Sequence, residues 1–172
     1  MIWIKTIIFS ILVPGVVTLF IPYCALKYTN SLDPIVFGVS EIIGIALMGL
    51  GLSIYLICVW NFAEIGKGTP APIAPPHLLI SRSLYKYSRN PMYIGIISIL
   101  VGETLIFRSF ILGGYTVLLF ICFHLFVRYY EELALSRQFG AEYARYCREV
   151  PRWLIHWPSG GRSAQLRHSS KN

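Results

Sequence analysis

The sequence of 172 residues is long enough for one domain, and its composition excludes an ordinary soluble one. Only 13% of the residues are charged and 55% are hydrophobic, whereas a soluble domain carries roughly 25% charged residues. The net charge of +7 does not indicate a nucleic-acid partner, because the basic residues flank apolar segments and form no separate basic domain.

Four apolar segments have the composition of helices that cross a bilayer, which takes roughly 20 residues. In chain order they are Ile2–Ile21, Ile35–Trp60, Met92–Phe107 and Phe110–Val127. We expect the first to be a retained helix and not a signal peptide, because its apolar stretch is long and bulky residues precede Cys24. The sequence therefore predicts an all-α fold, a polytopic membrane bundle of about four transmembrane helices.

Basic residues predict the orientation of this bundle. Of the 15 lysines and arginines, all except Lys27 and Arg108 lie in the N-terminus, in the loop between the second and third segments, or in the tail. Four spans place these three regions on one side, which by the positive-inside rule is the cytoplasm. We therefore expect a multi-pass protein of the lipid bilayer with both termini at the cytoplasmic face.

The loop before the third segment ends in a helix-start signal. Four prolines within residues 70–76 exclude a helix there. Asn90 is typical of an N-cap and Pro91 of a first helical residue, so a purely structural interpretation explains much of this stretch. A functional interpretation uses the same features, because a helix N-terminus beside Arg89 binds an anion such as a carboxylate.

The end of the fourth segment carries the densest polar cluster. His124, Arg128 and Glu132 are four residues apart and therefore share one face of a regular helix, with Glu131 close by. The two glutamates are also compatible with a solvated face of a helix that has left the membrane. His124 lies deeper, where it can pair with Glu103 of the third segment, either as structural glue or as a proton relay.

The tail begins with a pattern of tyrosines and arginines at 136–150 that predicts a C-terminal interfacial helix. Pro151 ends this helix, and Trp153 is typical of an interfacial anchor. Residues 159–172 predict a disordered basic tail. The chain thus divides into a two-helix hairpin (1–60), a core (61–158) and the tail (159–172). Its four cysteines contain no C-x-x-C pair, so we expect neither a metal nor a disulfide.

Together these motifs resemble the superfamily of isoprenylcysteine carboxyl methyltransferases and phospholipid methyltransferases. The resemblance covers about residues 68–153, half of the chain, and its elements occur in the family's order. They are Gly68-Thr69-Pro70-Ala71-Pro72 with Pro75-Pro76, Arg89-Asn90-Pro91-Met92-Tyr93-Ile94-Gly95, Glu131-Glu132 with Leu135, Phe139-Gly140, Tyr143, Tyr146 and Val150-Pro151-Arg152. Each element alone is weak, whereas the ordered set is specific. Two places depart from the pattern: Asn90 stands where His is common, and Arg82-Ser83-Leu84 precedes Tyr85 where the family usually has Gly-x-Tyr.

The resemblance implies an all-helical membrane enzyme without a Rossmann domain, and the sequence contains no G-x-G-x-x-G. It implies S-adenosylmethionine as the cofactor, an active site at the cytoplasmic mouth, and a membrane lipid or lipidated small molecule as the substrate. The expected cofactor-binding residues are Arg89, Asn90, Pro91, Tyr93, Gly95, Glu131, Glu132 and Tyr146. The catalytic candidates are Glu131, Arg128 and His124, and the substrate-binding candidates are Glu103 and Arg152.

In the implied reaction, a substrate oxygen, nitrogen or sulfur attacks the methyl carbon in line, and the protein aligns the pair and excludes water without a metal. O-methylation of a carboxylate is favoured, whereas an amine would need a base such as Glu131 or His124. Two alternatives stay open: a sterol-reductase-like enzyme that uses NADPH, and a non-catalytic membrane scaffold. The sequence does not choose among prenylcysteine, phosphatidylethanolamine, a small thiol and a quinone-like lipid as acceptor, and it does not give the oligomeric state.

Overall fold

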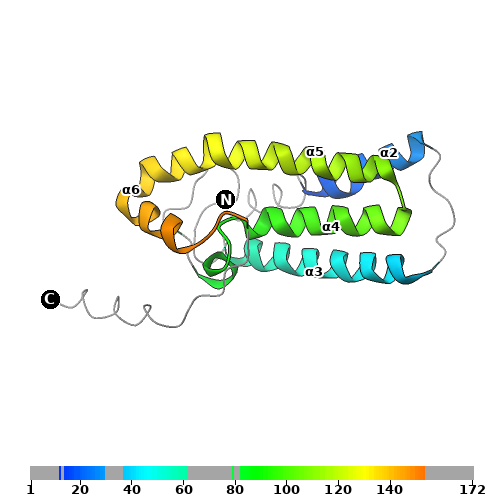
Figure 1. The fold of residues 1–172 in the computed structure, drawn as a ribbon, viewed down its shortest axis with the longest axis horizontal. Coiled ribbons are helices and arrows are strands. Elements are labelled where there is room, and N and C mark those ends of the chain that lie inside the picture. Colours follow the sequence, from blue (N-terminus) through cyan, green and yellow to red (C-terminus); the bar gives the residue numbers. More distant parts are fainter. Residues whose placement is uncertain (1–11, 13, 30–36, 62–78, 80–81, 154–172) are drawn as a thin grey trace.

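The computed structural model describes residues 12, 14–29, 37–61, 79 and 82–153 (Figure 1). Every regular element within these residues is a helix, which confirms the predicted all-α class. In chain order the elements are η1 (Val16–Phe20), α2 (Ile21–Tyr28), α3 (Val39–Asn61), η3 (Ser83–Lys86), α4 (Pro91–Phe107), α5 (Phe110–Phe126), η4 (Val127–Glu131) and α6 (Glu132–Glu149). Of these, η1 and η4 are π-helical and η3 is a 3-10 helix.

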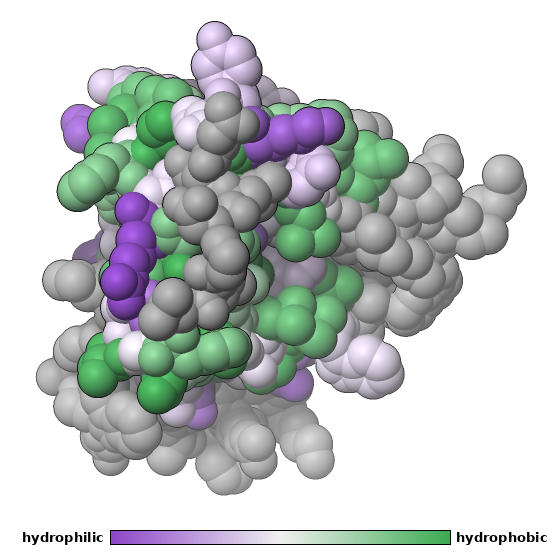
Figure 2. Space-filling view, turned by 90° about the vertical axis from the view of Figure 1, so that its right-hand side faces the viewer, coloured by the Kyte–Doolittle hydropathy of each residue, from purple (hydrophilic) through white to green (hydrophobic). Residues whose placement is uncertain are grey.

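The helices form a membrane bundle in which α4 lies between α3 and α5 (Figure 1). By length and composition, α3 and the continuous helix from Phe110 to Glu149 can each cross a membrane, while Val16–Tyr28 and α4 are shorter apolar helices. Large hydrophobic side chains such as Ile42, Leu56 and Leu118 are exposed on the outer faces. Outer faces of this kind are suited to lipid and not to water. The end of the bundle that faces the viewer in Figure 2 shows hydrophobic side chains together with several hydrophilic ones.

Glycines set the distance between α3 and α4. A Cβ on Gly51 would lie 2.5 Å from the carbonyl oxygen of Gly95, and a Cβ on Gly102 would lie 2.5 Å from the carbonyl oxygen of Gly44. The two backbones therefore touch at two places, seven residues apart on each helix. Close backbone approach through small residues is how helices associate in lipid, where the hydrophobic effect does not drive them together.

An ion pair joins the ends of these helices. Arg108, directly after α4, donates from Nε to Oε1 of Glu41 in the first turn of α3, at 2.7 Å. Oε2 of the same carboxylate accepts the backbone N–H of Gly38 at 2.8 Å, which caps the helix N-terminus. Because only 2% of the Glu41 side chain is exposed, its charge is stabilised by these partners and not by solvent.

The first helix differs from its prediction. The described part continues through Pro22 to Tyr28, beyond the predicted end at Ile21. Proline lacks a backbone N–H and would crowd a regular turn, and the π-helical turn η1 directly before it widens the helix at that point. The other parts of this span, the proline-rich loop at 70–76 and the tail at 159–172, lie outside the described residues.

Candidate active site

The start of α4 is bonded to the segment that follows α6. The backbone N–H of Arg89 donates to the carbonyl oxygen of Pro151 at 3.0 Å. The carbonyl oxygen of Arg152 accepts both from Ser88 Oγ and from Asn90 Nδ2, each at 3.1 Å. Asn90 stands at the predicted N-cap position, but its buried side chain makes this long-range bond in place of a cap. These bonds hold residues 88–90 against residues 151–152, more than 60 positions away in sequence.

Gly140 makes this return possible. It has φ +50 and ψ −118 inside α6, and a φ of this sign favours glycine. The chain changes direction there, so that Tyr143, Tyr146 and Val150 form a buried cluster. Tyr146 then donates from its hydroxyl to the carbonyl oxygen of Tyr85 at 2.7 Å. The second half of α6 is thus fixed to the residues that precede α4.

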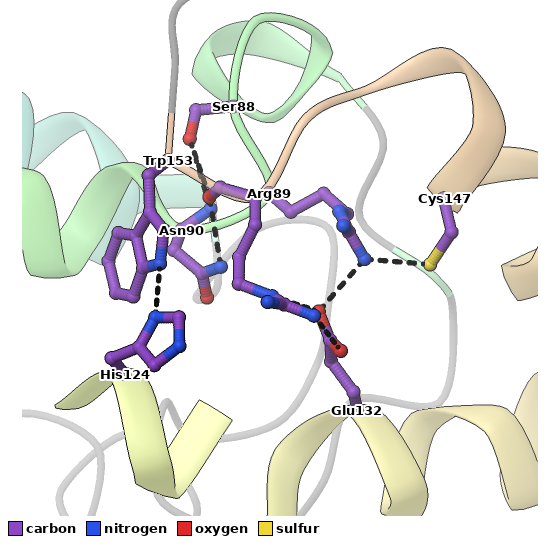
Figure 3. A network of polar contacts seen from close by, with 8 residues as sticks. Ser88, Arg89, Asn90, His124, Glu132, Cys147 and Trp153 are labelled. Carbon is purple, nitrogen blue, oxygen red and sulfur yellow. Dashed lines mark hydrogen bonds and ion pairs between the residues drawn. The ribbon is translucent and has the colours of Figure 1, made fainter. Parts of the chain in front are cut away.

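Two arginines share one carboxylate at this junction (Figure 3). Glu132 accepts from Arg89 Nη1 at 2.9 Å, and both of its oxygens accept from Arg152, each at 2.7 Å. Arg89 Nη1 also donates to Cys147 Sγ, and the buried Nε of Arg89 has no hydrogen-bond partner among the residues that the structure describes. One negative charge faces two positive ones, so the cluster has an excess positive charge and a spare donor. This arrangement is suited to an incoming carboxylate or phosphate.

Glu131 lies beside this cluster with a different partner. The hydroxyl of Tyr93, in the first turn of α4, donates to Glu131 Oε2 at 3.0 Å. Burial raises the pKa of the Glu131 carboxyl, and Glu132 acts in the same direction, although the Tyr93 hydrogen bond opposes them. A carboxylate in such a place can accept a proton or hold an ammonium group.

Aromatic rings form the remaining side of the site. The Tyr93 ring lies 4.7 Å from that of Phe123 and 6.4 Å from that of Trp153, measured between centroids. Trp153 also lies 5.2 Å from Phe120, and its indole Nε1 donates to His124 Nδ1 at 3.0 Å. These rings offer faces to a flat base or to a cationic centre next to Glu131.

The structure brings most of the predicted site residues to this one end of the bundle. Arg89, Glu132 and Arg152 form the cluster, and Asn90 is bonded to Arg152. Tyr93 and Glu131 are bonded to each other beside it, while His124 is bonded to Trp153 and Tyr146 to Tyr85. Pro91 is buried as the first residue of α4. Gly95 has a different surrounding from the one predicted, because its Cα faces Gly51 of α3 and the cluster is elsewhere.

Arg128 does not share the face of His124 and Glu132, contrary to the prediction. Its side chain is exposed and lies over the ring of Tyr129, 5.6 Å from the centroid. The spacing argument assumed a regular α-helix, but residues 127–131 form the π-helical turn η4. A stripe of buried and half-buried residues at intervals of four, through Phe123, Val127 and Glu131, would drift about 40° per turn around an α-helix, and the wider π turn reduces that drift.

Glu103 and His124 do not form the predicted pair. The acceptor nitrogen of His124 is bonded to Trp153, whereas Oε2 of the buried Glu103 has no hydrogen-bond partner. Glu103 stands twelve residues into α4 after Pro91. At 1.5 Å per residue that is roughly 18 Å from the start of α4, where the cluster is built.

Trp153 and Cys147 are the site residues that sequence reasoning missed. Trp153 suggested a lipid anchor, since tryptophan is common at membrane interfaces. Its place directly after Pro151-Arg152, which belong to the family pattern, was the one signal in the sequence that it lies at the site. Cys147 gave none, because its partner Arg89 is 58 positions away. Among the described residues, no three His, Cys, Asp or Glu side chains are placed to hold a metal ion.

Comparison with known proteins gives one match. A family model described as phospholipid methyltransferase matches residues 39–142, which include α3, α4, α5 and the glutamate pair. No curated protein and no solved structure matches the chain.

Proposed function

Because the chain belongs to the phospholipid methyltransferase family and is thereby a membrane methyltransferase, we propose that it transfers the methyl group of S-adenosylmethionine to an acceptor dissolved in the membrane. The observation that carries this proposal is the Arg89–Glu132–Arg152 cluster beside Glu131. S-adenosylmethionine has a carboxylate, an ammonium group, a cationic sulfonium and a flat adenine. The cluster, together with Glu131 and the neighbouring aromatic rings, offers a group of matching chemistry for each of these four features.

The amino-acid end of the cofactor fits the charged part of the site. Its carboxylate would bind the spare donor of Arg89, and its ammonium group would bind Glu131 or Glu132, since carboxylates are acceptors only. The sulfonium would then lie against Tyr93 and its aromatic neighbours. The methyl carbon would face the hydrophobic bundle, from which a membrane-dissolved acceptor arrives.

The chain's own groups would align the cofactor with the acceptor. They need not activate the methyl carbon, because it is already electrophilic in the bound cofactor. Arg152 would orient an acidic acceptor, which favours O-methylation of a carboxylate that arrives ionised and needs no base. An amine acceptor would transfer its proton to Glu131. The substrate roles of Arg152 and Glu103, and the catalytic roles of Glu131, Arg128 and His124, remain proposals.

Titration calorimetry in detergent micelles tests the cofactor assignment. We expect wild type to bind S-adenosylmethionine with saturation and not to bind NADPH, the cofactor of the reductase alternative. Arg89→Ala should weaken binding at least tenfold, about 1.4 kcal/mol, since a charge-assisted hydrogen bond is lost. Arg137→Ala, an exposed arginine of α6, is the matched control and should bind as wild type does. Saturable binding of NADPH, or equal binding by Arg89→Ala, would contradict the proposal.

A transfer assay identifies the acceptor. Methyl-labelled S-adenosylmethionine is incubated with protein in vesicles that contain a prenylcysteine, phosphatidylethanolamine, a small thiol or a quinone-like lipid. Label in a base-labile methyl ester indicates O-methylation, and label retained in the phosphatidylethanolamine headgroup indicates N-methylation. Absence of transfer to all four acceptors by protein that binds the cofactor would leave methyl transfer unsupported.

A further inference from the structure

Trp153 makes one directed contact with a side chain that is a candidate catalytic group. Its indole Nε1 lies 3.0 Å from Nδ1 of His124, and the two rings are inclined by 27° with centroids 6.1 Å apart (Figure 3). The indole nitrogen can only donate a hydrogen bond. The Nδ1 atom must therefore be the acceptor, with its lone pair directed at Trp153.

This bond determines where His124 carries its proton. A neutral imidazole has one N–H and one acceptor nitrogen, so an acceptor at Nδ1 requires the proton at Nε2. A doubly protonated ring has no acceptor and would lose the bond to Trp153. In the observed arrangement His124 is consequently neutral and can donate from Nε2, and it has no free lone pair to receive a proton.

The position of Trp153 does not depend on His124. The preceding residue, Arg152, is held through its carbonyl oxygen by Ser88 and Asn90 and through its guanidinium by Glu132. The indole ring also packs against Phe120 and Tyr93. The donor is thus fixed by the return of the chain after α6, and the His124 ring adapts to it.

We propose that Trp153 is a positioning residue that keeps His124 neutral with its proton on Nε2, so that His124 serves methyl transfer as a hydrogen-bond donor and not as the base. The second part of this inference rests on the proposed function. It assigns the base role, for an acceptor that needs one, to Glu131, whose carboxylate is bonded to Tyr93 at 3.0 Å.

Nuclear magnetic resonance of ring-labelled histidine shows directly which nitrogen of His124 carries the proton. This test of the first part does not depend on activity. The chain has four histidines, and the signal of His124 is the one that His124→Gln removes. We expect Nδ1 without a proton and Nε2 with one at neutral pH. Trp153→Phe keeps an aromatic ring but removes the donor, so the His124 signal should change to a mixture of tautomers. Trp60→Phe, at an exposed tryptophan of α3, should leave it unchanged.

The opposite tautomer, or a doubly protonated ring, in folded wild type at neutral pH would overturn the proposal. An unchanged signal in Trp153→Phe would do the same. A circular dichroism spectrum and thermal unfolding transition like those of wild type show that each variant is folded.

Methyl transfer by His124 variants tests the second part. Glutamine offers a carbonyl oxygen to the Trp153 indole and an N–H to the site, but it cannot take up a proton. We expect His124→Gln to keep kcat within about threefold of wild type and His124→Ala to lose at least tenfold, with the acceptor that wild type methylates. Equal loss in both variants, with cofactor binding intact, would show that His124 is the base and overturn the donor role. If wild type transfers no methyl group, the proposed function and the donor role fail together, while the tautomer signals still decide the role of Trp153.

Discussion

At the scale of single residues, Glu131 has a different environment from its neighbour Glu132. Within the described part of the chain, Glu132 accepts hydrogen bonds from two arginines, whereas Glu131 accepts one from the hydroxyl of Tyr93 and is half-buried. Burial therefore raises the pKa of Glu131. Two adjacent carboxylates with unlike surroundings are suited to unlike roles, one structural and one that exchanges a proton or binds a cation.

We predict that the pH dependence of cofactor binding reports this raised pKa. Only the ionised carboxylate holds an ammonium group, so affinity for S-adenosylmethionine should fall as the pH is lowered through a midpoint above the usual glutamate value of about 4.3. Glu131→Gln should bind more weakly and lose this dependence. Calorimetric titration across pH measures both effects, with Glu142→Gln, at an exposed residue of α6, as the control. A midpoint at or below the usual value in wild type would contradict the assignment.

Glu131 should make the free energy of unfolding depend on pH with a sign opposite to that for cofactor binding. A carboxyl whose pKa is higher in the folded state favours folding while it is protonated, and this contribution is lost as the pH rises through the folded pKa. The charge of Glu131 therefore does not stabilise the fold, and its removal in Glu131→Gln should not by itself unfold the protein.

Ser83 shows how a departure in the sequence can locate a feature of the backbone. It occupies the place of the glycine in the family's Gly-x-Tyr pattern, two residues before Tyr85, and its φ is +56. This left-handed conformation costs a non-glycine residue roughly 1–2 kcal/mol. A positive φ at this position thus explains both the glycine of the family pattern and the strain at Ser83. The residue types alone did not reveal this φ.

At the scale of elements, the glycine contacts between α3 and α4 determine how α4, which carries Tyr93 of the site, is aligned against α3. Gly51 lies against the carbonyl oxygen of Gly95, one turn inside the start of α4. Any side chain at these positions separates the helices and displaces Arg89 and Tyr93 along with the helix start. The sequence predicted both helices but not this contact, because apolar residues occur all around them and indicate no preferred face.

We predict opposite effects for two glycines of α3. Gly51→Ala places a methyl group 2.5 Å from the backbone of α4, so it should lower the free energy of unfolding by roughly 2–3 kcal/mol. Gly49→Ala meets nothing within 4 Å, and alanine in a helix interior should raise stability by about 0.5–1 kcal/mol. Thermal unfolding in detergent, followed by circular dichroism, compares the two. Equal midpoints would show that the α3–α4 contact is looser than 2.5 Å implies.

Element boundaries were more predictable from the sequence than the turns that orient side chains. Proline at 91 and the extent of the apolar run predicted the start and end of α4 almost to the residue, because local chemistry determines both. The π turn at 127–131 and the reversal at Gly140 were not foreseen. Both depend on packing with residues distant in sequence, such as Tyr85 and Arg89, and they decide that Arg128 is exposed while Arg152 joins the cluster.

At the scale of the whole molecule, the two ends of the bundle differ in charge. The end that holds the site carries Arg89 and Arg152 together with the arginines of α6, whereas Lys27 and Arg108 lie toward the other end (Figure 1). Arg108 is moreover neutralised by Glu41. By the positive-inside rule we predict that the site lies at the cytoplasmic face and the opposite end outside.

Added cysteines at the two ends test this orientation. We expect Tyr28→Cys, at a 91% exposed position after the first helix, to react with a membrane-impermeant maleimide in intact cells. Arg137→Cys, at an exposed position of α6, should react only after the membrane is permeabilised. The parent chain is the control, because its exposed Cys24 and Cys122 lie within apolar helices and should stay unreactive toward a reagent confined to water. Labelling of both variants in intact cells would contradict a crossing between the two ends. Labelling of Arg137→Cys alone would show that the orientation is inverted, with the site outside.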